Sequence, residues 1–205
     1  MKITSIEPQR NKNRVNIYVD NVFSIGIEQE LRYKYKLEVD MEVSDEFIKD
    51  ILKAEEQNKV TNHALNLLSY RQRSEKEIYN ALKRKGFEDS YIEYAMNYCR
   101  KNKYLDDKLF AQSFIKDKMN LNKLGPERIK YELMLKGISK DIIDEFLIVD
   151  SDEQYETAMK IALKKLNSYK NDDRNSIYRK LSGFLQRKGY SYDIISKVVK
   201  DILKD

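Results

Sequence analysis

A six-residue motif that carries glycine occurs three times in this 205-residue sequence, and it constrains the fold more than any other feature. Each copy begins with leucine and ends with glycine and a large apolar residue: Leu82-Lys-Arg-Lys-Gly86-Phe87, Leu133-Met-Leu-Lys-Gly137-Ile138 and Leu185-Gln-Arg-Lys-Gly189-Tyr190. The glycines are 51 and 52 residues apart. Such a period predicts a protein built from tandem structural repeats.

The glycine of each motif is predicted to end a helix. A helix commonly stops at a residue with positive φ, a conformation in which glycine avoids a steric penalty from Cβ. In that cap the residue after glycine packs against the leucine that opens the motif, giving the pairs Phe87–Leu82, Ile138–Leu133 and Tyr190–Leu185. The lysine before each glycine would face the negative end of the helix dipole; these residues are Lys85, Lys136 and Lys188.

Apolar residues keep the same spacing around the three glycines. Four of them follow each glycine by five, six, nine and ten residues, which describes one face of a second helix. Start signals agree: Ser74-x-x-Glu77 is a capping box, Pro126 suits a first helical turn, and Ser139 and Ser191 are candidate N-caps. A further helix is expected before each capped one, at about 60–71, 107–119 and 152–169.

The predicted fold is therefore mainly α, with three tandem three-helix repeats in an elongated, curved array. The repeats cover residues 59–105, 106–150 and 151–205. The alternative is a non-repetitive helical bundle whose helices happen to align.

Residues 1–58 have a different pattern. Apolar and polar residues alternate over 14–27 around Asp20-Asn21, which predicts a β-hairpin that Ile3–Ile6 can join as a third strand. The other elements expected here are a helix at 28–36, a short strand over Leu37–Val43, and a helix from Ser44 to about residue 58. So small a sheet has to pack against helices to be stable.

Composition excludes several classes of protein. Six glycines and two prolines disfavour a barrel of many short strands, one cysteine excludes an internal disulfide, and one histidine excludes a His-based metal centre. No phosphate loop or nucleophile motif occurs, so we expect no enzyme, no cofactor and no metal. His63, at an expected helix start, is interpreted as structural and Cys99 as a core residue. Asp106 and Asp107 are interpreted as helix-capping residues.

No secretory signal or membrane-spanning run is found, so we expect a cytoplasmic protein that makes no membrane contact. We also expect it to be a monomer. The net charge is +5, divided as −3 in residues 1–58, +5 in the first repeat, −1 in the second and +4 in the third. Two basic repeats around a near-neutral one fit a polyanionic partner, although lysine-rich solvated helices are the simpler explanation.

Basic and aromatic residues alternate in two places, Arg32-Tyr33-Lys34-Tyr35-Lys36 and Tyr70-Arg71-Gln72-Arg73. Cations bind phosphates while aromatic rings stack on unpaired bases, so this pattern favours single-stranded nucleic acid. Further basic residues are expected at helix ends: Lys83, Arg84, Lys85, Arg187 and Lys188. The competing interpretation places most tyrosines of the first repeat in the core, because Tyr70, Tyr79, Tyr91, Tyr94 and Tyr98 follow helical spacing.

Three stretches together resemble the RecX family of RecA-modulating proteins. They are 64–78 with Tyr70-Arg71-Gln72-Arg73-Ser74, 104–114 with Leu105-Asp106-Asp107, and 123–138 with Gly125-Pro126-Glu127-Arg128. The resemblance covers 60–150 by motif, 151–205 by repeat pattern and 1–58 only loosely.

This resemblance implies a non-enzymatic regulator that binds the RecA–DNA filament and usually inhibits RecA. The family motif falls on Arg71, Arg73, Leu105, Asp106, Asp107, Phe110, Ala111, Gly125, Arg128, Leu133 and Gly137. Most of these are expected to build the fold, whereas Arg71, Arg73 and Arg128 are expected to reach RecA or its DNA. Two other hypotheses stay open: a helical-repeat regulator that binds duplex DNA without RecA, and a plain protein–protein scaffold.

Overall fold

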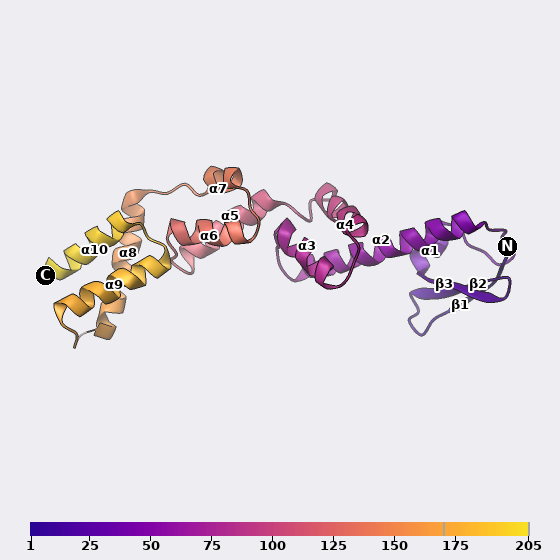
Figure 1. Ribbon diagram of the computed structural model, residues 1–205, viewed down its shortest axis with the longest axis horizontal. Coiled ribbons are helices and arrows are strands. Elements are labelled where there is room, and N and C mark those ends of the chain that lie inside the picture. The colour runs from indigo at the N-terminus through magenta and orange to yellow at the C-terminus, as the bar shows by residue number, and fades with distance from the viewer. Residues whose placement is uncertain (170, 205) are drawn as a thin grey trace. The chain divides into compact units, whose positions relative to one another are not determined.

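An antiparallel three-stranded sheet begins the chain (Figure 1). Strands β1 (Ile3–Pro8), β2 (Arg14–Val19) and β3 (Val22–Glu28) follow one another in space as in sequence. Asp20 and Asn21 form the turn with φ of 48° and 65°, the backbone that a two-residue type I′ hairpin requires. The predicted hairpin and its third strand are confirmed.

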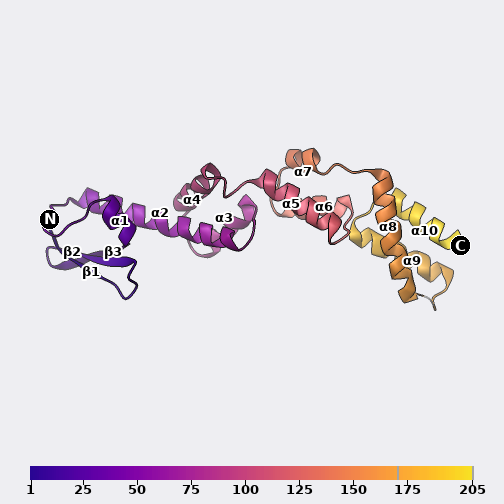
Figure 2. The same cartoon turned by 180° about the vertical axis from the view of Figure 1, so that it is seen from behind.

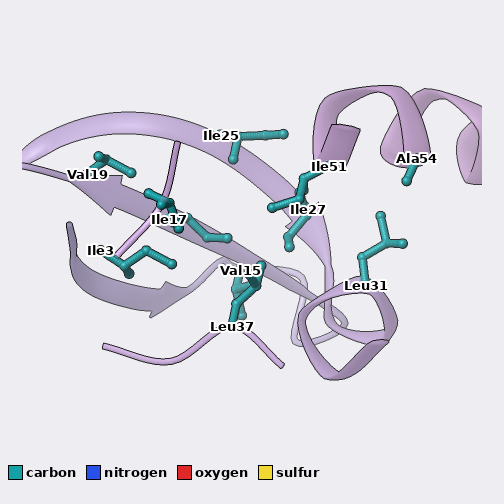
Figure 3. Close-up of a cluster of buried hydrophobic side chains, with 11 residues drawn as sticks. Ile3, Val15, Ile17, Val19, Ile25, Ile27, Leu31, Leu37, Ile51 and Ala54 are labelled. Carbon is teal, nitrogen blue, oxygen red and sulfur yellow. The ribbon is translucent and has the colours of Figure 1, made fainter. Parts of the chain in front are cut away.

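One face of the sheet packs against helices α1 (Gln29–Lys34) and α2 (Asp45–Tyr70). Figure 3 shows apolar side chains of the sheet meeting those of the two helices, and the fully buried ones include Ile17, Ile27 and Ile51. The buried side chain of Glu55 in α2 forms a 2.7 Å ion pair with Arg14, and it accepts a hydrogen bond from the Glu28 backbone N–H. The sheet is thus held to α2 by apolar packing and by one well-paired carboxylate.

The predicted strand over Leu37–Val43 is wrong. This segment is a loop that touches the sheet through isolated hydrogen bonds, such as Ile3 N–H to Met41 O, and through one bridge between Lys2 and Glu42. Asp40 adopts a φ of 74° and turns the chain, which breaks the extended geometry. Leu37 and Val43 are buried, but Val39 between them is 50% exposed, so only the two ends of the alternating run contact the core.

The helix break expected near residue 58 is also wrong. One helix, α2, continues from Asp45 to Tyr70, with Ser44 Oγ accepting the Phe47 N–H at its start. No glycine or proline stands between these ends, so nothing in the local chain stops the helix. His63 therefore lies inside a helix and not at its start; its ring packs edge-on against Phe87.

The remaining helices form three-helix repeats in the order the motifs predict (Figures 1 and 2). The end of α2 is followed by α3 (Glu75–Arg84) and α4 (Asp89–Lys101); then come α5 (Asp107–Asn120), α6 (Pro126–Leu135) and α7 (Lys140–Phe146). The last repeat holds α8 (Ser151–Leu166), a 3₁₀ turn (Asn167–Tyr169), α9 (Arg174–Lys188) and α10 (Tyr192–Lys204). The mainly helical fold class is confirmed.

The glycine caps have the predicted geometry. Gly86, Gly137 and Gly189 have φ of 86°, 84° and 90°. In each copy the residue after glycine donates its N–H to the carbonyl of the motif's leucine, as Tyr190 does to Leu185 at 3.2 Å. Leu82, Leu133 and Leu185 are fully buried. The motif thus ends α3, α6 and α9 in the same Schellman-type cap.

The structure describes residues 1–169 and 171–204, and these divide into two compact units. The first comprises residues 1–71 and 78–104, and the second residues 72–77 and 105 onward. The first turn of α3 thus belongs to the second unit. Residues 170 and 205, both inside the predicted third repeat, lie outside the description.

Candidate nucleic-acid and partner interface

Inside the second unit, the first turn of α3 rests on the glycine cap that ends α6. Ser74 Oγ donates a 2.7 Å hydrogen bond to the Lys136 carbonyl, and Lys136 Nζ forms a 2.9 Å ion pair with Glu77. Ser74 also completes the predicted capping box with Glu77. A Cβ on Gly137 would lie 2.7 Å from Lys76 Cβ, so this glycine also permits a close helix contact. We call this contact the first junction.

The start of α6 rests in the same way on the cap that ends α9 (Figure 2). Gly125 N–H donates to the Lys188 carbonyl at 2.8 Å, and Glu127 N–H donates to the Gly189 carbonyl at 3.1 Å. A Cβ on Gly189 would overlap the Arg128 backbone and Cβ. We call this contact the second junction.

The buried Tyr190 also fastens the second junction, because its hydroxyl donates to the Lys123 carbonyl at 3.1 Å. Burial raises the pKa of this hydroxyl to about 12. Among the described residues, a Cβ on Gly86 would meet nothing within 4 Å. The first glycine therefore ends a helix, but no other helix in the described part of the chain packs closely against it as at Gly137 and Gly189.

A groove of about 490 Å³ opens beside the second junction. It brings together three of the predicted binding residues, Arg128 of α6 and Arg187 and Lys188 of α9, which are up to 60 positions apart in sequence. Its other lining residues are Leu124, Glu132 and Phe184. The sequence analysis predicted each of these cations as a separate binding residue. That they line one groove depends on the second junction, which no local sequence pattern predicted.

Glu132 is the carboxylate of this groove. Its Oε1 accepts a 2.9 Å bond from Arg128 Nε, and its Oε2 lies 3.3 Å from Lys118 Nζ. Burial raises the pKa of Glu132, but hydrogen bonds from Arg128 and Lys118 outweigh that effect and leave the pKa below its usual value. Glu132 is therefore ionised near neutral pH and orients the Arg128 side chain.

The predicted cations on α3 have different surroundings. Lys83 forms a 3.0 Å ion pair with Asp89, and Tyr79 donates its hydroxyl to the same carboxylate at 2.8 Å. Arg84 donates to the Asn80 carbonyl. Lys85 is exposed. Burial, and to a smaller degree the positive charge of Lys85, lowers the pKa of His63.

The other predicted cations lie on α1 and on the α2–α3 connection. Arg32 is half-buried and reaches the Leu37 carbonyl at 3.4 Å, whereas Lys34 is exposed beside the Tyr35 ring. Arg71 is exposed at the C-cap of α2, and Arg73 is half-buried just before α3. Whether these residues contact a partner stays a prediction.

The interpretation of the first-repeat tyrosines as core residues is wrong for four of the five. Tyr70, Tyr79, Tyr94 and Tyr98 are exposed, with Tyr70 at 77%, and only Tyr91 is half-buried. The core face of α4 is filled by Ile92, Ala95, Met96 and Cys99 instead. These aromatic rings are therefore available at the surface, next to basic residues.

Of the acidic pair, Asp106 caps α5 as the sequence predicts, whereas Asp107 accepts a backbone N–H at the start of another helix, α3. Asp106 accepts the N–H groups of Lys108 and Leu109, and Asp107 accepts the Glu75 N–H at 2.9 Å. In residues 1–169 and 171–204, no group of three or more histidine, cysteine or acidic residues is placed to hold a metal ion. No helix in this described part is long and apolar enough to cross a membrane.

These features define a class: a helical-repeat protein with a small N-terminal sheet, glycine-capped junctions and exposed basic and aromatic side chains. Four family models match the chain in order. They are the regulatory protein RecX N-terminal domain over residues 1–44 and the first, second and third three-helix domains of RecX over 62–99, 106–147 and 152–199. The chain belongs to the RecX family of regulatory proteins.

Individual relatives agree with this assignment. The chain is 39% identical over 203 residues to the regulatory protein RecX of Clostridioides difficile strain 630, covering 98% of this chain and 95% of that protein. Its identity to the Clostridium perfringens SM101 protein is 40%, over 97% and 95% of the two chains. A crystal structure of regulatory protein RecX superposes with a TM-score of 0.78 at 30% identity over 98% of both chains. RecX from Lactobacillus salivarius gives 0.64 at 34% identity, over 72% of this chain and 97% of that one.

Proposed function

We propose that this protein is a non-enzymatic regulator that binds the RecA–DNA filament and lowers the recombinase, ATPase and coprotease activities of RecA. The observation that carries the proposal is the ordered match of four RecX domains along the chain. In this proposal the protein acts as a monomer in the cytoplasm and uses no cofactor of its own.

The mechanism we propose is bridging. Tandem repeats lie along the filament, and their basic side chains contact acidic RecA surface or DNA phosphates. A repeat protein held to neighbouring RecA subunits would hinder the motions that ATP turnover and strand exchange need. The exposed cations Arg71, Lys85 and Arg187, together with exposed tyrosines, support such a role.

The deciding experiment adds the purified protein to RecA assembled on single-stranded DNA and follows ATP hydrolysis and strand exchange. Both rates should fall as the protein approaches a stoichiometric ratio to RecA. Unchanged rates at that ratio would reject the proposal. Tight, sequence-selective binding to duplex DNA without RecA would favour the duplex-binding regulator instead.

A residue-level prediction concerns the α2–α3 connection. Replacing both Arg71 and Arg73 with alanine should weaken binding to the filament several-fold, since each cation contributes a charge-assisted contact. Binding is measured by the protein concentration that halves RecA ATPase activity. The matched control replaces Arg10 and Lys12, two exposed cations of the β1–β2 loop, with alanine. A loss of far-UV circular dichroism in the Arg71 and Arg73 variant would instead show that these arginines are structural.

A further inference from the structure

The two junctions have the same backbone contact but opposite charge. The residue nine positions before the glycine of one repeat approaches the lysine one position before the glycine of the next repeat. At the first junction this residue is Glu77, and it forms its ion pair with Lys136. At the second junction it is Arg128, which faces the same groove as Lys188. The first junction thus has a neutral ion pair where the second junction has two cations.

Among the residues that the structure describes, the cations of the second junction have no anionic partner apart from Glu132. Within the same residues, the one bond of Lys188 Nζ is to the carbonyl of Asn122 at 2.8 Å. Within the residues that the structure describes, the Arg187 side chain has no hydrogen bond or ion pair, and the terminal nitrogens of Arg128 donate to no acceptor. The groove therefore carries excess positive charge that its own side chains do not balance.

Aromatic and apolar side chains stand among these cations. Phe184 and Leu124 line the groove, and the Tyr131 ring, 54% exposed, lies 5.8 Å from the Arg128 guanidinium. Cations alone would fit any polyanion, an acidic protein surface included. Cations combined with flat apolar surface match a ligand that has phosphates and unpaired bases.

We propose that the groove beside the second junction binds the backbone of single-stranded DNA. Arg187 and the terminal nitrogens of Arg128 contact phosphates, Lys188 adds charge, and Phe184 and Tyr131 offer surface to the bases. The inference deepens the proposed function and rests on it, because it assigns one site through which the protein contacts the DNA of the filament.

The test measures binding of the full chain to a fluorescein-labelled oligothymidylate by fluorescence anisotropy, at several salt concentrations. Arg187→Gln should weaken binding by about fivefold and reduce the salt slope by about 0.7, the value for one phosphate contact on a single strand. Arg179→Gln is the matched control, since Arg179 is an exposed arginine of the same helix outside the groove. It should change affinity by less than about twofold.

Arg128→Glu is the sharper variant. It restores the charge pattern of the first junction, so the new carboxylate can pair with Lys188 as Glu77 pairs with Lys136. We expect affinity for the oligonucleotide to fall by more than about tenfold, while the far-UV circular dichroism spectrum stays that of the wild type. The urea midpoint should fall slightly, because the ion pair with Glu132 is lost and two carboxylates then lie four residues apart on one helix. Arg179→Glu controls for the same change of two charges.

Three results would overturn the inference: no binding of the oligonucleotide by the wild type, equal losses in groove and control variants, or groove variants that bind DNA normally but no longer inhibit RecA. The last result would assign the groove to an acidic protein surface. RecA ATPase is measured in parallel with the wild type. Groove-dependent DNA binding without any effect on RecA would reject the proposed function and leave the DNA site standing.

Discussion

The first and second junctions show which parts of a repeat are fixed by packing and which are free to change. Both place the start of one middle helix on the glycine cap of the next, and both glycines sit where a Cβ would collide. The charged residues differ: Glu77 pairs with Lys136 at the first junction, whereas Arg128 and Lys188 are both cations at the second. The backbone contact is thus the same at both junctions, whereas the surface charge presented to a partner differs.

The glycine caps permit the largest test of this comparison. Gly189→Ala should cost about 3 kcal/mol of unfolding free energy, because alanine is strained at positive φ and its Cβ overlaps the Arg128 backbone. Gly86→Ala should cost only about 1 kcal/mol, since only the φ penalty applies there. Urea unfolding followed by circular dichroism measures both. Equal losses would mean that the second junction contributes nothing to stability.

Ser74 tests the first junction. Its fully buried hydroxyl caps α3 and donates to the Lys136 carbonyl. Ser74→Ala should lower the free energy of unfolding by about 2 kcal/mol, because both a cap and a buried hydrogen bond are lost. Ser191→Ala is the control, since Ser191 caps α10 by a 3.4 Å bond and is exposed. A loss no larger than that of the control would show that the contact with α6 is unimportant.

Local chemistry predicted the helices and their ends well. Positive φ at the three glycines, the Ser74–Glu77 capping box and the Asp20-Asn21 turn each depend on residues close in sequence, and each is confirmed. The errors arise where tertiary contacts decide. Leu37 and Val43 lie in a loop and are nevertheless buried. The tyrosines of the first repeat have helical spacing, but most of them lie on exposed helix faces and not in the core.

The candidate site was predictable only in part. Sequence indicated Arg128, Arg187 and Lys188 as cations at helix ends, but their meeting in one groove depends on α6 resting on α9. The second role of Gly137 and Gly189, making room for the preceding repeat, likewise needs the packed structure. The three glycines occupy the same place in the motif, but of the three only Gly86 has space for a Cβ.

The smallest expected effect on stability concerns Glu132 at the second junction. It is the groove's own anion, and bonds from Arg128 and Lys118 hold its pKa below the usual 4.5 in spite of burial. Because the folded-state pKa is lowered, its contribution to stability is present above pH 4.5 and is lost as the pH falls through the folded-state value. Glu132→Gln should therefore cost less than about 1 kcal/mol at neutral pH, and the difference from wild type should shrink as the pH falls below 4.5 and through the lowered folded-state pKa.

The same Glu132→Gln variant should bind oligothymidylate about two- to threefold more tightly than the wild type, because the groove gains one net positive charge and the Arg128 guanidinium loses its competing carboxylate. Anisotropy at fixed salt measures this change. Glu77→Gln, at the first junction, is the matched control, and it should leave the affinity unchanged because Glu77 does not line the groove. Tighter binding by both variants would mean that net charge alone governs the affinity. Weaker binding by Glu132→Gln would mean that Glu132 matters mainly by orienting Arg128, so that the carboxylate prepares the cation and does not compete for it.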